Sequence, residues 1–257
     1  MSRVLVVCAR RYNGHELWTA LGVMQRAGHT FEVISSDTDI EDEVTGQRNT
    51  IERTIHDVDP SEMESFDGLM IVSGNMADTE AYWSNKTVLG YVDAAEADQK
   101  QIAAVCCSVP TVRYAAKGKK VSFFPLVRSR QILKEAGAIL QTVALTVDQN
   151  LATAEHQMAT QMWANAFSKM LNGEDPEVNL VDSGYIPRGR PRKPIEGMNK
   201  VQARLAQTKD IYLIPNVTEE NRVNYAYKLS RATPVKLHTH ISGEECNGDC
   251  IVLGEES

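Results

Sequence analysis

The first 173 residues alternate short apolar runs with segments whose apolar residues recur at helical spacing. Runs rich in β-branched residues at 3–8, 31–36 and 66–75, and a further apolar run at 101–107, predict buried strands. The segments 15–28 and 85–99 have helical periodicity and predict helices. Strands that alternate with helices are typical of a parallel sheet covered on both faces. The expected fold class is therefore α/β, a doubly wound parallel sheet sandwich whose sites form at the carboxyl ends of the strands.

The remaining segments of this unit have weaker patterns. Residues 37–65 are polar and acidic, which predicts a short hairpin and a surface loop. Strands are expected at 119–125 and 139–150, and helices at 108–116, through 130–137 and at 159–173. We expect Ser108 to cap the N-terminus of its helix and Gly173 to end the last one. The predicted α/β domain thus spans residues 1–173.

The rest of the chain has a different composition. Residues 174–200 are rich in Pro, Gly and charge, which indicates a linker. Residues 201–257 form a small C-terminal α+β extension, with strands predicted at 211–215 and 234–242, a helix at 218–232 and an acidic tail. Because such a segment is too small for an independent core, we expect it to lean on the first domain or on a partner.

Composition narrows the class of protein. The chain has 257 residues, 42% hydrophobic and 24% charged, with a net charge of −7, as expected of a soluble globular protein and not of a non-specific polyanion binder. No apolar run approaches the roughly 18 residues that span a bilayer, so no membrane contact is expected. The N-terminus lacks a secretory signal pattern, and five cysteines do not form an even disulfide framework. These features favour a cytoplasmic location.

The apolar run 101–107 ends in two adjacent cysteines, Cys106 and Cys107. A thiol at a strand-to-helix turn lies at the carboxyl edge of the sheet, and the N-terminus of the following helix favours its thiolate form. Cys106 is therefore a candidate nucleophile. The alternative is that both cysteines are small buried residues, since free cysteine is among the most buried residue types.

The chain resembles the ThiJ/PfpI superfamily, which shares a flavodoxin-like fold with class I glutamine amidotransferase domains. The resemblance covers about residues 2–173 and rests on RVLVVCARRYNGHELWTALGVMQRAG, FDGLMIVSGN, AAVCCSVP and the closing helix through MLNG. It implies that Cys106 is the nucleophile of an elbow, that Glu16 hydrogen-bonds the thiol, and that the amides of Gly74 and Cys107 form an oxyanion pocket. It also implies a homodimer. The alternative interpretation is that Glu16 is an ordinary glutamate in the first turn of a helix, where it interacts favourably with the helix dipole.

The chain departs from the superfamily at its proton-transfer group. Members with hydrolase or glyoxalase activity usually carry a histidine at one of two positions, which are occupied here by Cys107 and Phe124. His156, expected at the start of the last helix, is a candidate replacement, with Glu155 or Glu16 to orient it. His15, adjacent to Glu16, is a second candidate. Glutamine amidotransferases use a His and Glu separated by one residue and a glycine-flanked elbow, and this chain has neither.

The linker contains PRGRPRKP, which matches the AT-hook, a segment that enters the minor groove of A/T-rich DNA. The groove-binding residues would be Arg188, Gly189, Arg190, Pro191 and Arg192, because the glycine and proline keep the chain narrow and extended while the arginines meet the negative potential of the groove. A single hook makes few contacts and binds weakly. The alternative is a solubilising Pro/Arg linker.

The C-terminal extension carries four residues of the types that bind zinc. His238, His240, Cys246 and Cys250 form an HxH followed by a CxxxC, a ligand set that tetrahedral zinc accepts. The spacing is not that of a common zinc finger, and packing or exposure of these side chains is the alternative. A structural zinc is therefore a hypothesis for the extension, whereas no cofactor is expected in the α/β domain.

These features support three functional hypotheses. The first is hydrolase or lyase chemistry at Cys106 on a small carbonyl, amide or glycated substrate. The second is a redox-sensing or chaperone-like protein without catalysis, with weak A/T-rich DNA binding. The third is an ammonia-supplying amidotransferase subunit, against which the glycine-poor elbow argues.

Overall fold

The computed structural model describes residues 1–176 together with the strands β13 (Lys236–His238) and β14 (Cys250–Val252), which pair in parallel. The chain divides into two units, Met1–Leu180 and Val181–Ser257. Several predictions lie outside the described residues: the linker from residue 177 on, the AT-hook-like residues 188–192, the strand 211–215 and the helix 218–232.

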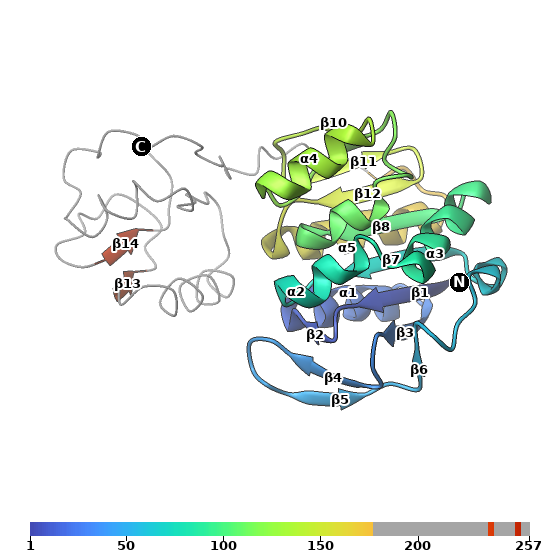
Figure 1. Ribbon diagram of the computed structural model, residues 1–257, viewed down its shortest axis with the longest axis horizontal. Helices are drawn as coiled ribbons and strands as arrows, with labels where there is room; N and C mark the ends of the chain where they lie inside the picture. The colour runs from blue at the N-terminus through green and yellow to red at the C-terminus, as the bar shows by residue number, and fades with distance from the viewer. Residues whose placement is uncertain (177–235, 239–249, 253–257) are drawn as a thin grey trace. The chain divides into compact units, whose positions relative to one another are not determined.

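A seven-stranded sheet forms the centre of the first unit (Figure 1). Its order is β11-β12-β8-β7-β1-β3-β6, and every neighbouring pair is parallel except β11 with β12. The strands are β1 (Arg3–Cys8), β3 (Thr30–Ser35), β6 (Arg53–Thr54), β7 (Gly68–Val72), β8 (Gln101–Val105), β11 (Leu145–Asp148) and β12 (Leu151–Ala154). The predicted doubly wound α/β class is confirmed.

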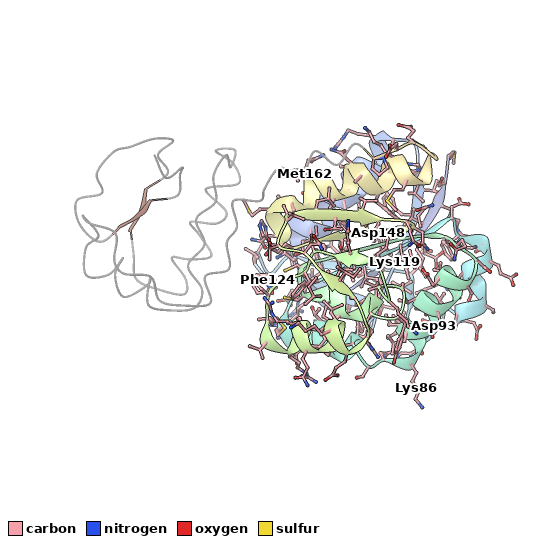
Figure 2. All side chains as sticks on the ribbon, turned by 90° about the horizontal axis from the view of Figure 1, so that it is seen from above. Lys86, Asp93, Lys119, Phe124, Asp148 and Met162 are labelled. Carbon is pink, nitrogen blue, oxygen red and sulfur yellow. The ribbon has the colours of Figure 1, made fainter. Side chains whose placement is uncertain are left out.

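Helices cover both faces of this sheet (Figure 1). One core contains buried side chains of α1 and α5, and the core on the opposite face contains those of α3, α4 and the 3₁₀ helix η2. The side chains drawn in Figure 2 fill the space between the layers. The helices are α1 (Gly14–Arg26), η1 (Pro60–Ser65), α2 (Met76–Tyr82), α3 (Lys86–Ala97), η2 (Cys106–Val112), α4 (Val127–Glu135), η3 (Gln157–Ala159) and α5 (Thr160–Leu171). Among the residues that the structure describes, no helix is long and apolar enough to cross a membrane.

Within the first unit, two small sheets lie outside the central one. The first joins β2 (Arg11–Tyr12), β4 (Asp39–Asp42) and β5 (Arg48–Thr50), of which β4 and β5 form the hairpin predicted within 37–65. The second pairs β9 (Lys120–Val121) with β10 (Ile139–Leu140). The predicted strand 119–125 is therefore only two residues long.

Two sequence-based expectations are wrong, and two elements were missed. Ser108 is not the N-cap, because η2 begins at Cys106 with Val105 as the N-cap, and Ser108 lies at the third position of the helix, where its side chain accepts the Val105 amide proton. Glu155 and His156 are not at the start of the last helix, because they come after a strand, β12, and α5 begins at Thr160. The strand β12 and the helix α2 were not expected at all. Both are short, with four and seven residues, too few for a periodic pattern to be read.

The strand order indicates where a ligand-binding site is expected. From β1 the chain adds β3 on one side of the sheet and then β7 and β8 on the other, so the order reverses between β1 and β7. In open α/β sheets, ligands bind outside the carboxyl ends of the strands at such a switch point. The segments immediately after β1, β7 and β8 are therefore where a site is expected.

Candidate functional site

Cys106 comes directly after β8 and adopts a left-handed backbone conformation, with φ of 59°. This conformation costs a non-glycine residue about 1 kcal/mol or more and persists only where the surrounding structure imposes it. It turns the chain sharply from the strand into η2. The side chain is half-buried and packs against the core on the α1 and α5 face of the sheet.

Two side chains hold this turn. The hydroxyl of Ser108 accepts the amide proton of Val105 at 3.1 Å and lies within hydrogen-bond distance of the carbonyl oxygens of Val105 and Ile71, at 2.7 and 2.8 Å. The indole Nε1 of Trp83 donates to the carbonyl oxygen of Cys107 at 2.9 Å. Ser108 therefore fixes the elbow to β7 and β8, a different role from the helix cap expected of it.

Glu16 lies in the first turn of α1 and is fully buried, with 0% exposure. Its Oε2 accepts hydrogen bonds from the amide of Ser73 at 3.0 Å and from the Ser73 hydroxyl at 2.7 Å. Ser73 directly follows β7, and Cys106 directly follows β8, the strand that pairs with β7. Glu16 is thus more than a surface residue that favours the helix dipole, because its carboxyl is buried and anchored to Ser73, directly after β7.

Glu155 occupies the corresponding position on the other side of Cys106. Ala154 of β12 pairs with Val105 of β8, so Glu155 is level with Cys106 in the sheet. Glu155 is 2% exposed, and its amide donates to the carbonyl oxygen of Ala144 at 2.9 Å. The end of β12 therefore brings the buried Glu155 to this edge of the sheet, and the first turn of α1 brings the buried Glu16, which is bonded to Ser73.

His156, the predicted catalytic base, has a capping role in this structure. Its Nδ1 accepts the amide proton of Met158 at 3.0 Å, which caps η3. The side chain is buried, and burial lowers the pKa of His156 to about 4. The imidazole is therefore neutral near pH 7 and a weak base there, which argues against a role in taking the thiol proton.

Gly74 comes after β7 and lies against the chain that continues from β1. A Cβ at this position would lie 2.0 Å from the carbonyl oxygen of Arg11 and 2.6 Å from Cα of Tyr12, so only glycine fits the bridge between Gly74 and Tyr12. Its amide, one of the two predicted oxyanion donors, donates to Thr79 Oγ1 at 3.1 Å. The other, the amide of Cys107, lies at the N-terminal end of η2, where amides lack partners within the helix.

Sequence reasoning missed a polar network at the same edge. The Nδ2 of Asn13 donates to Gln157 Oε1 at 2.7 Å and to Glu43 Oε1 at 3.2 Å, and the Asn13 amide donates to the carbonyl oxygen of Ser73 at 2.9 Å. Asn13 also caps α1 by accepting the amide proton of Glu16. Its place before a predicted helix could have identified the cap, whereas its distant partners left no signal in the sequence.

The other sulfur atoms near the sheet differ in access. Cys107 is 6% exposed, and its Sγ lies 3.7 Å from Sγ of Cys106. Cys8, at the end of β1, is fully buried, and burial raises the pKa of its thiol to about 12. Phe124, labelled in Figure 2, is half-buried, and its amide lies 3.5 Å from the carbonyl oxygen of Cys106. The backbone of Phe124, one of the two positions where the resemblance led us to expect a histidine, therefore lies beside the elbow.

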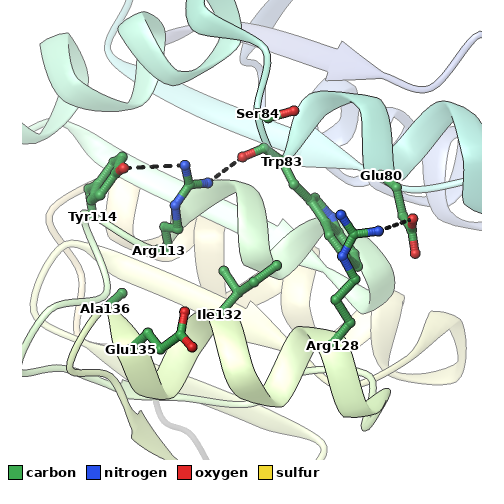
Figure 3. A pocket seen from close by; sticks show the side chains of 9 residues that line it. All are labelled: Glu80, Trp83, Ser84, Arg113, Tyr114, Arg128, Ile132, Glu135 and Ala136. Atoms are coloured by element: carbon green, nitrogen blue, oxygen red, sulfur yellow. Dashed lines mark hydrogen bonds and ion pairs between the residues drawn. The ribbon is translucent and has the colours of Figure 1, made fainter.

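A cleft of about 370 Å³ lies beside the elbow helix, between η2, α2 and α4 (Figure 3). Arg113 donates to the carbonyl oxygen of Trp83 and to the Tyr114 hydroxyl, and Arg128 pairs with Glu80 at 2.8 Å. Both guanidinium groups thus have protein partners. Trp83 lines this cleft and also contacts Cys107, so it connects the cleft to the elbow.

The predicted zinc ligands are only partly described. His238 and Cys250 lie on the paired strands β13 and β14, where His238 is in register with Val252 and Lys236 with Cys250. His240 and Cys246 lie outside the described residues. Within the described part of the chain, no group of three or more His, Cys, Asp or Glu side chains could hold a metal ion.

Comparison with known proteins gives the family. The sequence matches the DJ-1/PfpI family over residues 2–170. The chain belongs to this family. An uncharacterized protein of Methanocaldococcus jannaschii is 27% identical over 154 residues, which is 59% of this chain and 73% of that protein.

Solved structures show the same fold. The ThiJ/PfpI domain protein from Brachyspira murdochii is 19% identical with a TM-score of 0.60, over 66% of this chain and 96% of that one. DJ-1beta from Drosophila melanogaster is 21% identical with a TM-score of 0.57, over 68% and 94% of the two chains. At these identities the likeness shows the fold, and the matched part corresponds to the first unit.

Proposed function

We propose that this DJ-1/PfpI-family protein uses Cys106 as a nucleophile in hydrolase- or lyase-type chemistry on a small carbonyl, amide or glycated substrate. The observation that carries the proposal is the left-handed backbone of Cys106 directly after β8, at the sheet edge where α1 supplies the buried Glu16 and the end of β12 supplies the buried Glu155. Such a turn presents the sulfur at the sheet edge instead of in the core, and the strain it stores is typical of functional sites.

Different groups around the elbow would carry out the successive steps of the reaction. The Cys106 thiolate would attack the carbonyl carbon of the substrate, forming a C–S bond while the carbonyl electron pair moves to oxygen. The amide of Cys107, at the start of η2, would donate to this oxyanion. A carboxyl group would then deliver the proton that the departing group needs, because His156 is a weak base and no histidine occupies either usual position.

Glu16 suits the task of stabilising the thiolate. Its Oε2 already accepts two hydrogen bonds from Ser73, so a proton on this carboxyl would reside on Oε1. A protonated carboxyl donates to sulfur and stabilises the thiolate, whereas an ionised one opposes it. The carboxyl is fully buried, so it is shielded from bulk water.

A substrate screen tests this proposal. Methylglyoxal, glutamine and short peptides are incubated with the full chain and with Cys106→Ser, and the fold of both is compared by near-UV circular dichroism. We expect turnover of at least one substrate class by the wild type and a loss of about 100-fold or more in the variant, because hydroxyl is a far weaker nucleophile than thiolate at neutral pH. Equal turnover by the two proteins would contradict the role of Cys106.

A further inference from the structure

Cys106 and Cys107 are adjacent in the chain, and their sulfur atoms are in contact. Their Sγ atoms are 3.7 Å apart. Cys106 is half-buried at the edge of the sheet, whereas Cys107 is 6% exposed. A small oxidant would therefore reach the sulfur of Cys106 first and meet that of Cys107 only afterwards.

We propose that Cys107 is the resolving thiol of Cys106, so that a hydroperoxide converts the pair into a reversible vicinal disulfide. The proposal rests on the proposed function only in its first step, the reactivity of Cys106. It assigns to this chain a two-cysteine redox site for which the substrate is a hydroperoxide, and it gives Cys107 a role distinct from that of its backbone amide.

The chemistry balances over two steps. The Cys106 thiolate attacks one peroxide oxygen, the O–O bond breaks, and the products are a sulfenic acid and water, or an alcohol where the oxidant is organic. The Cys107 sulfur then attacks the Cys106 sulfur, an S–S bond forms and the S–O bond breaks. The hydroxyl group leaves as water with the proton of the Cys107 thiol. The peroxide is reduced and the two thiols are oxidised.

The distance favours the second step. Reacting atoms in a near-attack arrangement are about 3 to 3.5 Å apart, so a small rotation about either Cα–Cβ bond brings the two sulfur atoms into range. The low exposure of Cys107 also keeps solvent and further peroxide away from its side of the elbow. Condensation therefore competes with addition of a second oxygen to the sulfenic acid.

The resulting bond would be strained, which makes it reversible. Adjacent Cα atoms joined by a trans peptide are about 3.8 Å apart, whereas disulfides usually join Cα atoms about 4.4 to 6.8 Å apart. Closing the ring must therefore twist the peptide between Cys106 and Cys107. Strained disulfides have more oxidising potentials and are reduced readily by small thiols.

The strained peptide would lie next to a carbonyl group that is hydrogen-bonded to Trp83, so the fluorescence of Trp83 can detect the strain. Trp83 Nε1 donates to the carbonyl oxygen of Cys107, which belongs to the peptide directly after the twisted one. Forming the disulfide should shift this carbonyl and change the environment of the indole. The fluorescence of Trp83 therefore offers a readout that is independent of mass.

Mass analysis of one peptide tests the proposal. Trypsin cleaves after Lys100 and Arg113, so residues 101–113 contain both cysteines of the pair and no other, while Cys8 and the pair Cys246 and Cys250 fall in different peptides. The full-length protein is treated with a small excess of hydrogen peroxide, remaining thiols are blocked with N-ethylmaleimide, and the 101–113 peptide is weighed before and after dithiothreitol. Cys107→Ser and Cys107→Ala are treated in parallel, and Cys8→Ala serves as the matched control.

In the wild type and in Cys8→Ala we expect the 101–113 peptide to lose two hydrogens and to recover both thiols with dithiothreitol. In the Cys107 variants it should instead gain two oxygens as a sulfinic acid, which dithiothreitol does not reverse. The fluorescence change should occur in the wild type and be absent from Trp83→Phe and from both Cys107 variants.

Two results would overturn the proposal, and they differ. Gain of two oxygens by the wild type at the rate of the Cys107 variants would show that Cys107 does not resolve Cys106, while leaving Cys106 reactive. Absence of any oxidation at Cys106 in all four proteins would contradict the reactive nucleophile itself, and with it the proposed function.

Discussion

Two strands of the central sheet, β1 and β8, lead into a cysteine through similar apolar sequences, but the two cysteines differ in burial and in backbone conformation. β1 ends VLVVC and β8 ends IAAV before Cys106, so each apolar run leads into a cysteine at the same edge. Cys8 stays in the strand, is fully buried, and its carbonyl accepts hydrogen bonds from Ser35 and Tyr82. Cys106 leaves the strand in a left-handed conformation and is half-buried.

The two strands differ in the backbone that follows them. After β8 a helix begins at once, and Ser108 and Trp83 hold the turn so that the sulfur lies at the edge of the sheet. After β1 no helix begins at once, because two residues lead into the strand β2. The sulfur of Cys8 stays in the core, where burial raises the pKa of its thiol to about 12. We therefore expect the reactivity of these two thiols to depend on the backbone after the strand and not on the strand sequence.

The largest expected effect is a difference in alkylation rate. At pH 7 a thiol of pKa about 12 is ionised in about one molecule in 10⁵, whereas an ordinary thiol is about 3% ionised. Cys106 should therefore react with iodoacetamide at least about 1000-fold faster than Cys8 in the folded protein, as measured by mass spectrometry of their separate tryptic peptides. Equal alkylation rates of Cys106 and Cys8 in the folded protein would contradict the contrast between the two strand ends. The control is the protein unfolded in urea, in which the two cysteines should react at the same rate.

The same substitution at the two strand ends should change stability unequally. Cys8→Gly removes a fully buried side chain and adds the backbone entropy of glycine, so it should destabilise the fold by about 2 to 3 kcal/mol. Cys106→Gly relieves about 1 kcal/mol of left-handed strain and loses a half-buried side chain, so its net effect should stay within about 1 kcal/mol of zero. Urea unfolding of both variants measures this, and equal losses would show that the Cys106 conformation stores no strain.

A smaller effect concerns the third strand end, that of β12. His156 has a folded pKa of about 4 and an unfolded pKa near 6.5, so near pH 5 the unfolded chain binds a proton that the folded chain does not. Its contribution to stability is therefore complete above pH 6.5 and is lost as the pH falls toward 4. Between pH 7 and pH 5 the wild type should lose about 2 kcal/mol more than His156→Asn, which keeps a capping side chain. Parallel losses in urea unfolding would place the imidazole in contact with solvent.

How much of the fold could be predicted from the sequence depends on the length of each hydrophobic pattern. The strands at 3–8 and 101–107, the helix after Asn13 and the parallel sheet were predicted from runs long enough to show a period, and they were confirmed. The positions of Cys106 and Glu16 at the carboxyl edge came from these runs and from the family resemblance. Their chemical roles stay predictions.

The parts that could not be predicted depend on long-range pairing. Glu155 reaches the elbow only because the four-residue strand β12 pairs with β8, and the Asn13, Glu43 and Gln157 network joins three distant loops. The capping of η3 by His156 depends on a local backbone that no periodicity indicates. For the same reason, the histidine predicted as a base proved to be buried and of low pKa.

The activation of Cys106 by Glu16 is tested most directly by the alkylation rate of Cys106 at pH 6 in three proteins: wild type, Glu16→Gln and Glu16→Leu. Gln keeps an oxygen for Ser73 and offers an N–H to the sulfur, whereas Leu of similar volume offers neither. Near-UV circular dichroism verifies the fold of each variant.

We expect wild-type Cys106 to react at least about 10-fold faster at pH 6 than the cysteines of the urea-unfolded chain, since an ordinary thiol is almost wholly protonated there. Glu16→Gln should keep most of this rate, and Glu16→Leu should lose about 10-fold or more. A folded Glu16→Leu protein that reacts as fast as the wild type would contradict the central claim that the buried carboxyl beside the elbow activates Cys106.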